Sequence, residues 1–148
     1  MNETPLRRLL RKKGTSVITT DPAATVYDAI ATMVDHNVGA IVVTDDGALV
    51  GIFTERDYLR RIVLQGRTSK TTTVRDAMTA DVLTVSPTTT VEAALSIMTE
   101  ARCRHLPVMA AGRLAGIVSI GDCVKHLLRN AEAEIDTLER YVTGRYPG

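Results

Sequence analysis

The chain has 148 residues, 45% of them hydrophobic, and a formal net charge of +1. This length suits one ordinary domain or two half-domains that share a core, and the near-neutral charge argues against nucleic-acid binding. No apolar run is long enough to cross a bilayer, and the N-terminus lacks the apolar core of a signal peptide. The two cysteines, Cys103 and Cys123, fit a reduced protein, so we expect a cytoplasmic location.

The first expected element is a short helix within residues 1–14. Thr4-Pro5 is typical of an N-cap followed by proline at the first helical position, and Gly14 is typical of a helix end. The helix has one apolar face that should pack on the body, formed by Leu6, Leu9 and Leu10. Its basic residues resemble a targeting or membrane-surface segment, but the solvated face and basic C-terminal end of a helix explain them better. They are Arg7, Arg8, Arg11, Lys12 and Lys13.

Residues 15–66 are expected to form the first of two half-domains. The predicted order is a strand over 17–19, a helix from Thr25 to a stop at 37–39, strands over 40–44 and 49–53, and a helix that opens at Thr54. Thr25 and Asp28 have the spacing of a capping box. Asp45-Asp46-Gly47 is a strong hairpin signal between the two later strands.

A linker and a short helix are expected at 67–78, where residues 74–78 would be the counterpart of the end of the N-terminal helix. The second half-domain, 79–129, repeats the order: a strand over 82–85, a helix over 90–100, strands over 106–109 and 114–118 around a turn at Gly112, and a helix from Ser119. An apolar stripe at helical spacing continues into an extension at 130–148, through Val124, Leu127, Leu128, Ala131, Ile135, Leu138 and Val142. The stripe needs a partner, either the N-terminal helix or another subunit, and the tail at 143–148 should fray.

Two stretches with one pattern define the repeat. They are Gly51-Ile52-Phe53-Thr54-Glu55-Arg56-Asp57 and Gly116-Ile117-Val118-Ser119-Ile120-Gly121-Asp122. They stand 65 positions apart, and the same offset pairs Val17 with Val82, Pro22 with Pro87 and Met33 with Met98. A fixed period indicates repeated structural units. A unit of about fifty residues is too small to bury the apolar face of its own sheet. We therefore expect an α+β fold of two β-α-β-β-α repeats packed about a pseudo-two-fold axis.

Thr54-x-x-Asp57 and Ser119-x-x-Asp122 allow two interpretations. Each is a variant capping box, in which hydroxyl and carboxylate satisfy free N–H groups of the first helical turn. Each could instead hold a ribose, with the carboxylate accepting from both vicinal hydroxyls, and the same groups could do both. Arg102-Cys103-Arg104-His105, before the strand at 106–109, is either an exposed charged helix end or a phosphate clamp. The first half has the neutral Asn37-Val38-Gly39-Ala40 there.

The ordered set of motifs, present twice, resembles a tandem pair of CBS domains, the regulatory module named after cystathionine β-synthase. The matching residues of the first half are Thr19, Pro22, Thr25-Val26, Ala29, Met33 and Gly51-Ile52-Phe53-Thr54-x-x-Asp57. Those of the second half are Thr84, Pro87, Thr90-Val91, Ala94-Leu95, Met98, Arg104-His105-Leu106-Pro107-Val108 and Gly116-Ile117-Val118-Ser119-x-x-Asp122. The resemblance covers about residues 8–129 and implies a stand-alone CBS pair with two clefts for adenosine compounds.

In the family each cleft mixes both repeats, so the resemblance implies two sets of site residues. The first cleft would use Thr54, Asp57, Val82, Thr84, Arg104, His105 and Pro107, with Arg56 as a further phosphate contact. The second would use Ser119, Asp122, Val17, Thr19, Val38, Gly39 and Ala40, with Lys13 compensating for the missing basic pair. Family ligands are AMP, ADP, ATP, NAD(H) and S-adenosylmethionine, and a phosphate clamp favours the nucleotides.

The resemblance therefore implies a sensor that reports energy or redox state to a partner protein, and a homodimer, since family pairs often dimerise into a flat disc. Two alternatives stay open: a structural dimerisation module with empty clefts, and a small enzyme or redox protein that uses Cys103, whose basic neighbours would lower its pKa. Cys123 and His126 could supply two metal ligands, but no cluster supplies two more. We therefore expect neither a metal nor a catalytic cofactor.

Overall fold

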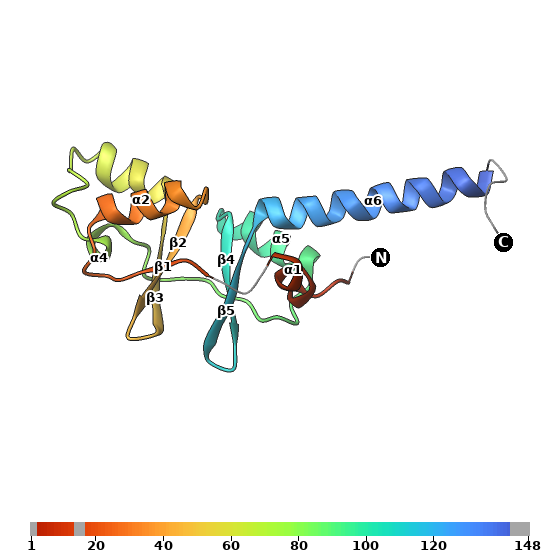
Figure 1. Cartoon of the computed structure of the whole chain (residues 1–148), viewed down its shortest axis with the longest axis horizontal. Coiled ribbons are helices and arrows are strands. Elements are labelled where there is room, and N and C mark those ends of the chain that lie inside the picture. Colours follow the sequence, from red (N-terminus) through yellow and green to blue (C-terminus); the bar gives the residue numbers. More distant parts are fainter. Residues whose placement is uncertain (1–2, 14–16, 143–148) are drawn as a thin grey trace.

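The computed structural model describes residues 3–13 and 17–142 and has the expected α+β architecture of two CBS-like repeats (Figure 1). Each repeat is a lobe in which helices cover a small sheet, and the two sheets meet where β3 contacts β5. A long C-terminal helix projects from the second lobe. The two lobes are described in turn, because the differences between them decide where a ligand site forms.

The first repeat is built on a three-stranded sheet in the order β1-β2-β3. β1 (Thr19–Thr20) pairs parallel with β2 (Ala40–Asp45), which pairs antiparallel with β3 (Ala48–Thr54). α2 (Val26–Asp35) packs its apolar face on the sheet, and Thr25 caps it by accepting from the Asp28 N–H at 3.1 Å. α3 (Glu55–Asp57) continues directly into a π-helix, Tyr58–Val63. Such π-helical turns occur frequently at functional sites.

The second repeat follows the first in its helix and hairpin, but its sheet has two strands, because the first strand is replaced by an isolated bridge. α5 (Val91–Ala101) covers β4 (His105–Ala110) and β5 (Arg113–Ser119), which pair antiparallel. α6 (Ile120–Val142) follows. The predicted helices and hairpins of both halves and the first strand of the first half are thus confirmed to within a few residues, whereas the first strand of the second half is not. The strand expected over 17–19 is β1 at 19–20.

Residues 82–85 do not form the predicted strand, because proline interrupts the pairing. Val85 makes a single parallel bridge with Val108, in which its N–H donates to the Pro107 carbonyl at 3.1 Å and its carbonyl accepts from Met109 at 2.8 Å. The next bond toward residue 83 would need an N–H at position 107, and proline has none. In the first repeat the equivalent Val42 N–H does reach the Ile18 carbonyl, at 3.4 Å.

The short helix that precedes each repeat packs on the other repeat (Figure 1). α1 (Leu6–Lys13) contributes Leu6, Leu9 and Leu10 to the core formed by α5, β4 and β5. α4 (Val74–Ala77) contributes Val74 and Ala77 to the core formed by α2, β2 and β3. The apolar face predicted for the N-terminal helix is therefore buried against the second half of the chain.

Equivalent backbone hydrogen bonds hold α1 and α4 in place. They join Leu6 to Thr89 (2.8 Å) and Thr4 to Val91 (2.9 Å) in one repeat, and Val74 to Ala24 (2.8 Å) and Thr72 to Val26 (2.9 Å) in the other. Leu6 thus corresponds to Val74, an offset of 68 positions where the rest of the repeat has 65. The short helix at 74–77 is therefore the counterpart of the beginning of α1, not of its end as predicted.

The first glycine of each repeated motif lies directly against a side chain from the segment of α1 or α4. A Cβ on Gly51 would lie 2.5 Å from the Met78 sulfur, and one on Gly116 would lie 2.6 Å from Leu10 Cδ2. Met78 and Leu10 are themselves related by the offset of 68. A Cβ at Gly51 would also lie 3.0 Å from the Thr79 carbonyl oxygen, so a side chain there would press on the crossing backbone, whereas a side chain at Gly116 would displace the Leu10 side chain.

Both hairpins turn through two residues with positive φ, which is the type I′ geometry that suits twisted strands. In the first hairpin they are Asp46 (φ 52°) and Gly47 (φ 82°), and in the second Ala111 (φ 51°) and Gly112 (φ 75°). The left-handed region costs an alanine about 1–2 kcal/mol, whereas Asn and Asp tolerate it better. The second turn is therefore the weaker of the two.

Replacing Ala111 by asparagine is expected to raise the free energy of unfolding by about 0.5–1 kcal/mol, since Asn-Gly is a favoured type I′ pair. Urea denaturation would measure the change. The reverse change in the first hairpin, Asp46→Ala, serves as the matched control and should lower stability by a similar amount. If Ala111→Asn left the denaturation midpoint where it was, strain at this turn would not limit stability.

α6 begins with the same cap as α3 and then leaves the body. The Asp122 N–H donates to Ser119 Oγ at 3.1 Å, and the Ser119 N–H donates to Asp122 Oδ2 at 2.9 Å. Leu127 packs against the second core and α1 contacts α6, but the side chains of residues 131–140 are all exposed. Within the described residues, no helix has the length and apolar character needed to span a bilayer.

Candidate ligand site between the two repeats

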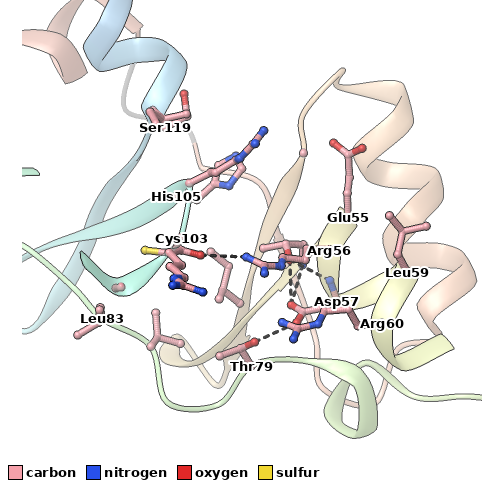
Figure 2. Close-up of a pocket in the computed structure, with 18 of the residues that line it drawn as sticks. Glu55, Arg56, Asp57, Leu59, Arg60, Thr79, Leu83, Cys103, His105 and Ser119 are labelled. Atoms are coloured by element: carbon pink, nitrogen blue, oxygen red, sulfur yellow. Dashed lines mark hydrogen bonds between the residues drawn. The ribbon is translucent and has the colours of Figure 1, made fainter. Parts of the chain in front are cut away.

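A cavity of about 1270 Å³ lies between the two repeats (Figure 2). The first repeat lines it with the end of β3, with α3 and with the π-helix, and the second lines it with the end of α5, the start of β4 and the start of α6. The connecting segment contributes Thr79, Asp81, Val82 and Leu83. Since side chains 40 to 60 positions apart face one cavity, any ligand that fills it must contact both repeats.

Thr54 and Asp57 form a complete capping box at one side of this cavity. Asp57 Oδ2 accepts from the Thr54 N–H at 3.0 Å and from its hydroxyl at 3.1 Å, while the Asp57 N–H donates to Thr54 Oγ1 at 3.1 Å. Asp57 is only 8% exposed, yet it lines the cavity. The capping interpretation of this motif is confirmed, and its contact with a ribose stays a prediction.

The other oxygen of Asp57 is bound by Thr79, which the sequence analysis did not select. The Thr79 hydroxyl donates to Asp57 Oδ1 at 3.0 Å (Figure 2). Thr79 is placed there by an isolated bridge with Ile52, in which the two residues exchange N–H···O bonds of 2.8 and 2.9 Å. The offset of 65 pairs Thr79 with Gly14, so the repeat pattern carried no sign of this contact.

Arg56 connects the two repeats across the cavity. Its Nη1 donates to the carbonyl of Arg102 at 3.1 Å (Figure 2). Arg102 ends α5 in a left-handed conformation with φ 55°, so its carbonyl is free of the helix ladder. This contact is the direct link between the Thr-x-x-Asp motif of the first repeat and the basic segment of the second.

The lining of the cavity is cationic. Five arginines and His105 face three carboxylates there, and the arginines are Arg56, Arg60, Arg61, Arg102 and Arg104. Arg61 is committed to the fold, because it donates to the Ala77 carbonyl at 3.3 Å and to the Met78 carbonyl. The other four are exposed at the cavity surface. Arg60 and Arg61 were not among the predicted site residues.

Gly39 keeps the cavity open beside His105. A Cβ at this position would lie 2.6 Å from Glu55 Oε1 and 3.6 Å from His105 Cε1. The Glu55 carboxylate and the His105 ring thus approach the same point from opposite repeats (Figure 2). His105 is half-buried as the first residue of β4, where it pairs with Ser119.

The structure brings together half of the residues predicted for the two clefts. Those that line this cavity are Thr54, Arg56, Asp57, Val82, Arg104 and His105 from the first set and Gly39 and Ser119 from the second. Those that do not line it are Thr84, Pro107, Val17, Thr19, Val38, Ala40 and Asp122. The side chain of Lys13 lies outside the described part of the chain. A separate second cleft therefore stays a prediction.

Cys103 lacks the features of a reactive thiol, although it lies beside two arginines in the cavity. Burial raises its pKa above the ordinary value for cysteine, more than the hydrogen bonds to the backbone lower it. The expectation that basic neighbours lower this pKa was wrong, because desolvation dominates. Cys123 is fully buried in the second core. Among the described residues, no group of three or more potential ligands gathers around a metal position.

The family model for the CBS domain matches this chain twice, over residues 7–64 and 74–129. The chain belongs to the CBS domain family. The mitochondrial CBS domain-containing protein CBSX3 of Arabidopsis thaliana is 44% identical over 154 residues, which cover 97% of this chain and 74% of the relative. Because that relative is named for mitochondria, the cytoplasmic location stays a prediction.

Two solved structures of bacterial CBS proteins are similar to this chain over most of its length. A protein with CBS domains from Burkholderia ambifaria is 42% identical with a TM-score of 0.83, covering 85% of this chain and 95% of that one. A CBS-domain containing protein from Agrobacterium tumefaciens is 44% identical with a TM-score of 0.80, covering 83% and 98%. The predicted pair of CBS repeats is therefore confirmed.

Proposed function

We propose that the chain is a regulatory protein that binds an adenine nucleotide between its repeats and reports energy or redox state to a partner protein. The observation that carries the proposal is the cavity that unites the Thr54–Asp57 pair of one repeat with exposed arginines of both. The name of the Burkholderia relative assigns that protein, provisionally, to signal transduction. We expect a regulatory role and no catalysis, in keeping with the CBS domain family to which the chain belongs.

The cavity offers separate groups for the two ends of a nucleotide. At one side Asp57 presents a carboxylate, which would accept from the ribose hydroxyls. Arg104 and His105 of the second repeat line the same cavity as Arg56 of the first, and guanidinium groups bind phosphate through paired, charge-assisted hydrogen bonds. AMP, ADP, ATP and NAD(H) all fit this division, whereas S-adenosylmethionine lacks the phosphate that the arginines would bind.

Ligand binding would have to compete with two hydrogen bonds seen here. A carboxylate has about four acceptor sites, and Thr54 and Thr79 already use three on Asp57. Two ribose hydroxyls therefore need one threonine hydroxyl to turn away. A phosphate would likewise draw Arg56 from the neutral Arg102 carbonyl, since charge-assisted bonds are the stronger. Both changes loosen links between segments, so ligand would shift the population of two arrangements of the repeats.

The proposal is tested by native mass spectrometry of the purified chain, with release and identification of any bound small molecule. We expect an adenine nucleotide at one or two copies per chain. Where the protein is purified bare, thermal unfolding is measured with AMP, ATP, NADH and S-adenosylmethionine in turn, and the phosphate-bearing ligands should raise the midpoint. A bare protein that responds to none of the four would instead be a structural module with empty clefts.

A further inference from the structure

The segment that connects the two repeats is held at each end by a backbone bridge. Thr79 exchanges two hydrogen bonds with Ile52 of the first repeat, and Val85 makes the parallel bridge with Val108 of the second. Within the described residues, no backbone N–H or carbonyl of residues 80–84 takes part in a hydrogen bond. We call residues 80–84 the strap. Its backbone donors and acceptors are available to a further partner, and water satisfies them until one binds.

The strap lines the cavity between the repeats (Figure 2). Asp81, Val82 and Leu83 face the cavity, and Leu83 is 51% exposed although it is a large apolar residue. The strap thus offers an apolar side chain together with unpaired backbone donors and acceptors. A heterocyclic base suits this combination, because its flat faces stack on apolar groups while its edge carries hydrogen-bonding atoms.

Pro107 keeps the strap out of the sheet of the second repeat. In a parallel ladder, the bond that follows the bridge of Val85 would join an N–H at position 107 to the Leu83 carbonyl. The Leu83 N–H would then donate to the His105 carbonyl. Proline has no N–H, so the ladder stops at Val85. Proline normally occurs in a sheet where its missing donor faces no partner strand. Here the segment that would be the partner is the strap.

The first repeat shows the same place in the fold without a proline. Val42 stands at the position equivalent to Pro107, and its N–H reaches the Ile18 carbonyl at 3.4 Å. There the first strand is paired as β1, and neither Ile18 nor Val42 lines the cavity. In the two repeats, the presence of this backbone donor thus goes with a paired first strand, and its absence goes with a strap that lines the cavity.

We propose that Pro107 is a positioning residue of the ligand site, which keeps the backbone of the strap unpaired and thereby free to bind the base of the ligand. Pro107 is itself buried and does not line the cavity, so it acts through the strap and not by contact. The inference rests on the proposed nucleotide function and adds to it the control of the surface that receives the base. A substitution that removes no ligand contact should therefore close the site.

Pro107→Val tests the proposal, because it copies Val42 and restores the missing donor. Nuclear magnetic resonance titration should show binding of AMP weakened by about tenfold or more, as expected for the loss of one or two hydrogen bonds. Binding of ribose 5-phosphate, which has no base, should be unchanged. A general disturbance of the cavity would weaken both ligands alike. Pro107→Ala restores the same N–H and should give the same result where valine prevents folding.

Hydrogen exchange follows the strap in the same samples without any ligand. The Leu83 amide should exchange freely in the parent chain and slowly in Pro107→Val, because the restored ladder engages it. The matched control is Pro87→Val, which adds an N–H in the turn beyond Val85. Pro87 does not line the cavity, so this change should leave the exchange of Leu83 and both affinities as they are in the parent chain.

The outcomes separate this inference from the proposed function. AMP binding that Pro107→Val leaves unchanged, equal losses for AMP and ribose 5-phosphate, or fast exchange of Leu83 in Pro107→Val would overturn the role of Pro107 alone. A parent chain that binds no nucleotide would overturn the proposed function, and this inference with it.

Discussion

Leu6→Ala is expected to destabilise the chain by about 2–5 kcal/mol, although the substitution lies in a short N-terminal helix. The Leu6 side chain is fully buried in the core of the second repeat, together with Val91 and Leu106. Truncation removes buried methyl groups and leaves a cavity that α5 and β4 cannot close. Because the lost contacts belong to the second repeat, the effect should appear there first.

Urea denaturation measures the loss, and hydrogen exchange locates it. Faster exchange is expected in β4 and β5 than in β2 and β3 under mild denaturant. Leu64→Ala is the matched control, since Leu64 is 80% exposed and its truncation should change stability by no more than about 0.5 kcal/mol. Equal effects of the two substitutions, or a loss confined to the first repeat, would contradict the packing of α1 on the second repeat.

The second large effect concerns ligand binding: Asp57→Asn is expected to remove the stabilisation that a nucleotide confers. A ligand at a hundred times its Kd stabilises the folded chain by about 2.7 kcal/mol, and a hundredfold weaker Kd would reduce this to about 0.4 kcal/mol. Asparagine keeps the size of the side chain and can still accept from the Thr54 N–H, but it offers one acceptor oxygen to the ribose in place of two. Thermal unfolding with and without AMP gives both values.

Asp122→Asn is the matched control for this substitution. Asp122 occupies the same position in the equivalent cap of α6, but it does not line the cavity. Both substitutions should weaken a helix cap, by about 1 kcal/mol, and Asp57→Asn should also weaken the Thr79 bond and the 4.0 Å ion pair with Arg61, so the response to ligand is the quantity compared. Only Asp57→Asn should abolish the response to AMP. If both variants lost the same stability and responded to AMP like the parent chain, the motif would be a helix cap alone.

Much of the fold could be predicted from the sequence, because the signals are local and occur twice. Thr25 and Thr54 cap helices as expected, and both glycine turns form hairpins where predicted. The missing strand at 82–85 depends on one backbone N–H that Pro107 lacks on the facing strand. Such a loss is a property of the pairing, so inspection of 82–85 alone could not reveal it.

The repeated pattern and the departures from it predict part of the candidate site. Thr54 and Asp57 belong to the repeated motif, Arg104 and His105 stand out because the first half has Gly39 and Ala40 at their positions, and all four line the cavity. Thr79 could not be predicted in either way, because it lies in the segment where the offset changes from 65 to 68. At that offset its counterpart is Arg11, which lies on α1 and carries a charge in place of a hydroxyl. The two repeats therefore present different groups near their Thr/Ser-x-x-Asp motifs.

The packing of α1 on the second repeat, and of α4 on the first, also constrains the order in which the protein can fold during synthesis. The first repeat can complete its core as soon as residue 78 is available, because α4 follows it directly. The second repeat needs α1, which leaves the ribosome first but finds its binding surface only after β5 has formed. Until then the leucine face of α1 stays exposed. Closing the chain between Leu6 and Thr89 is thus a late and entropically costly step.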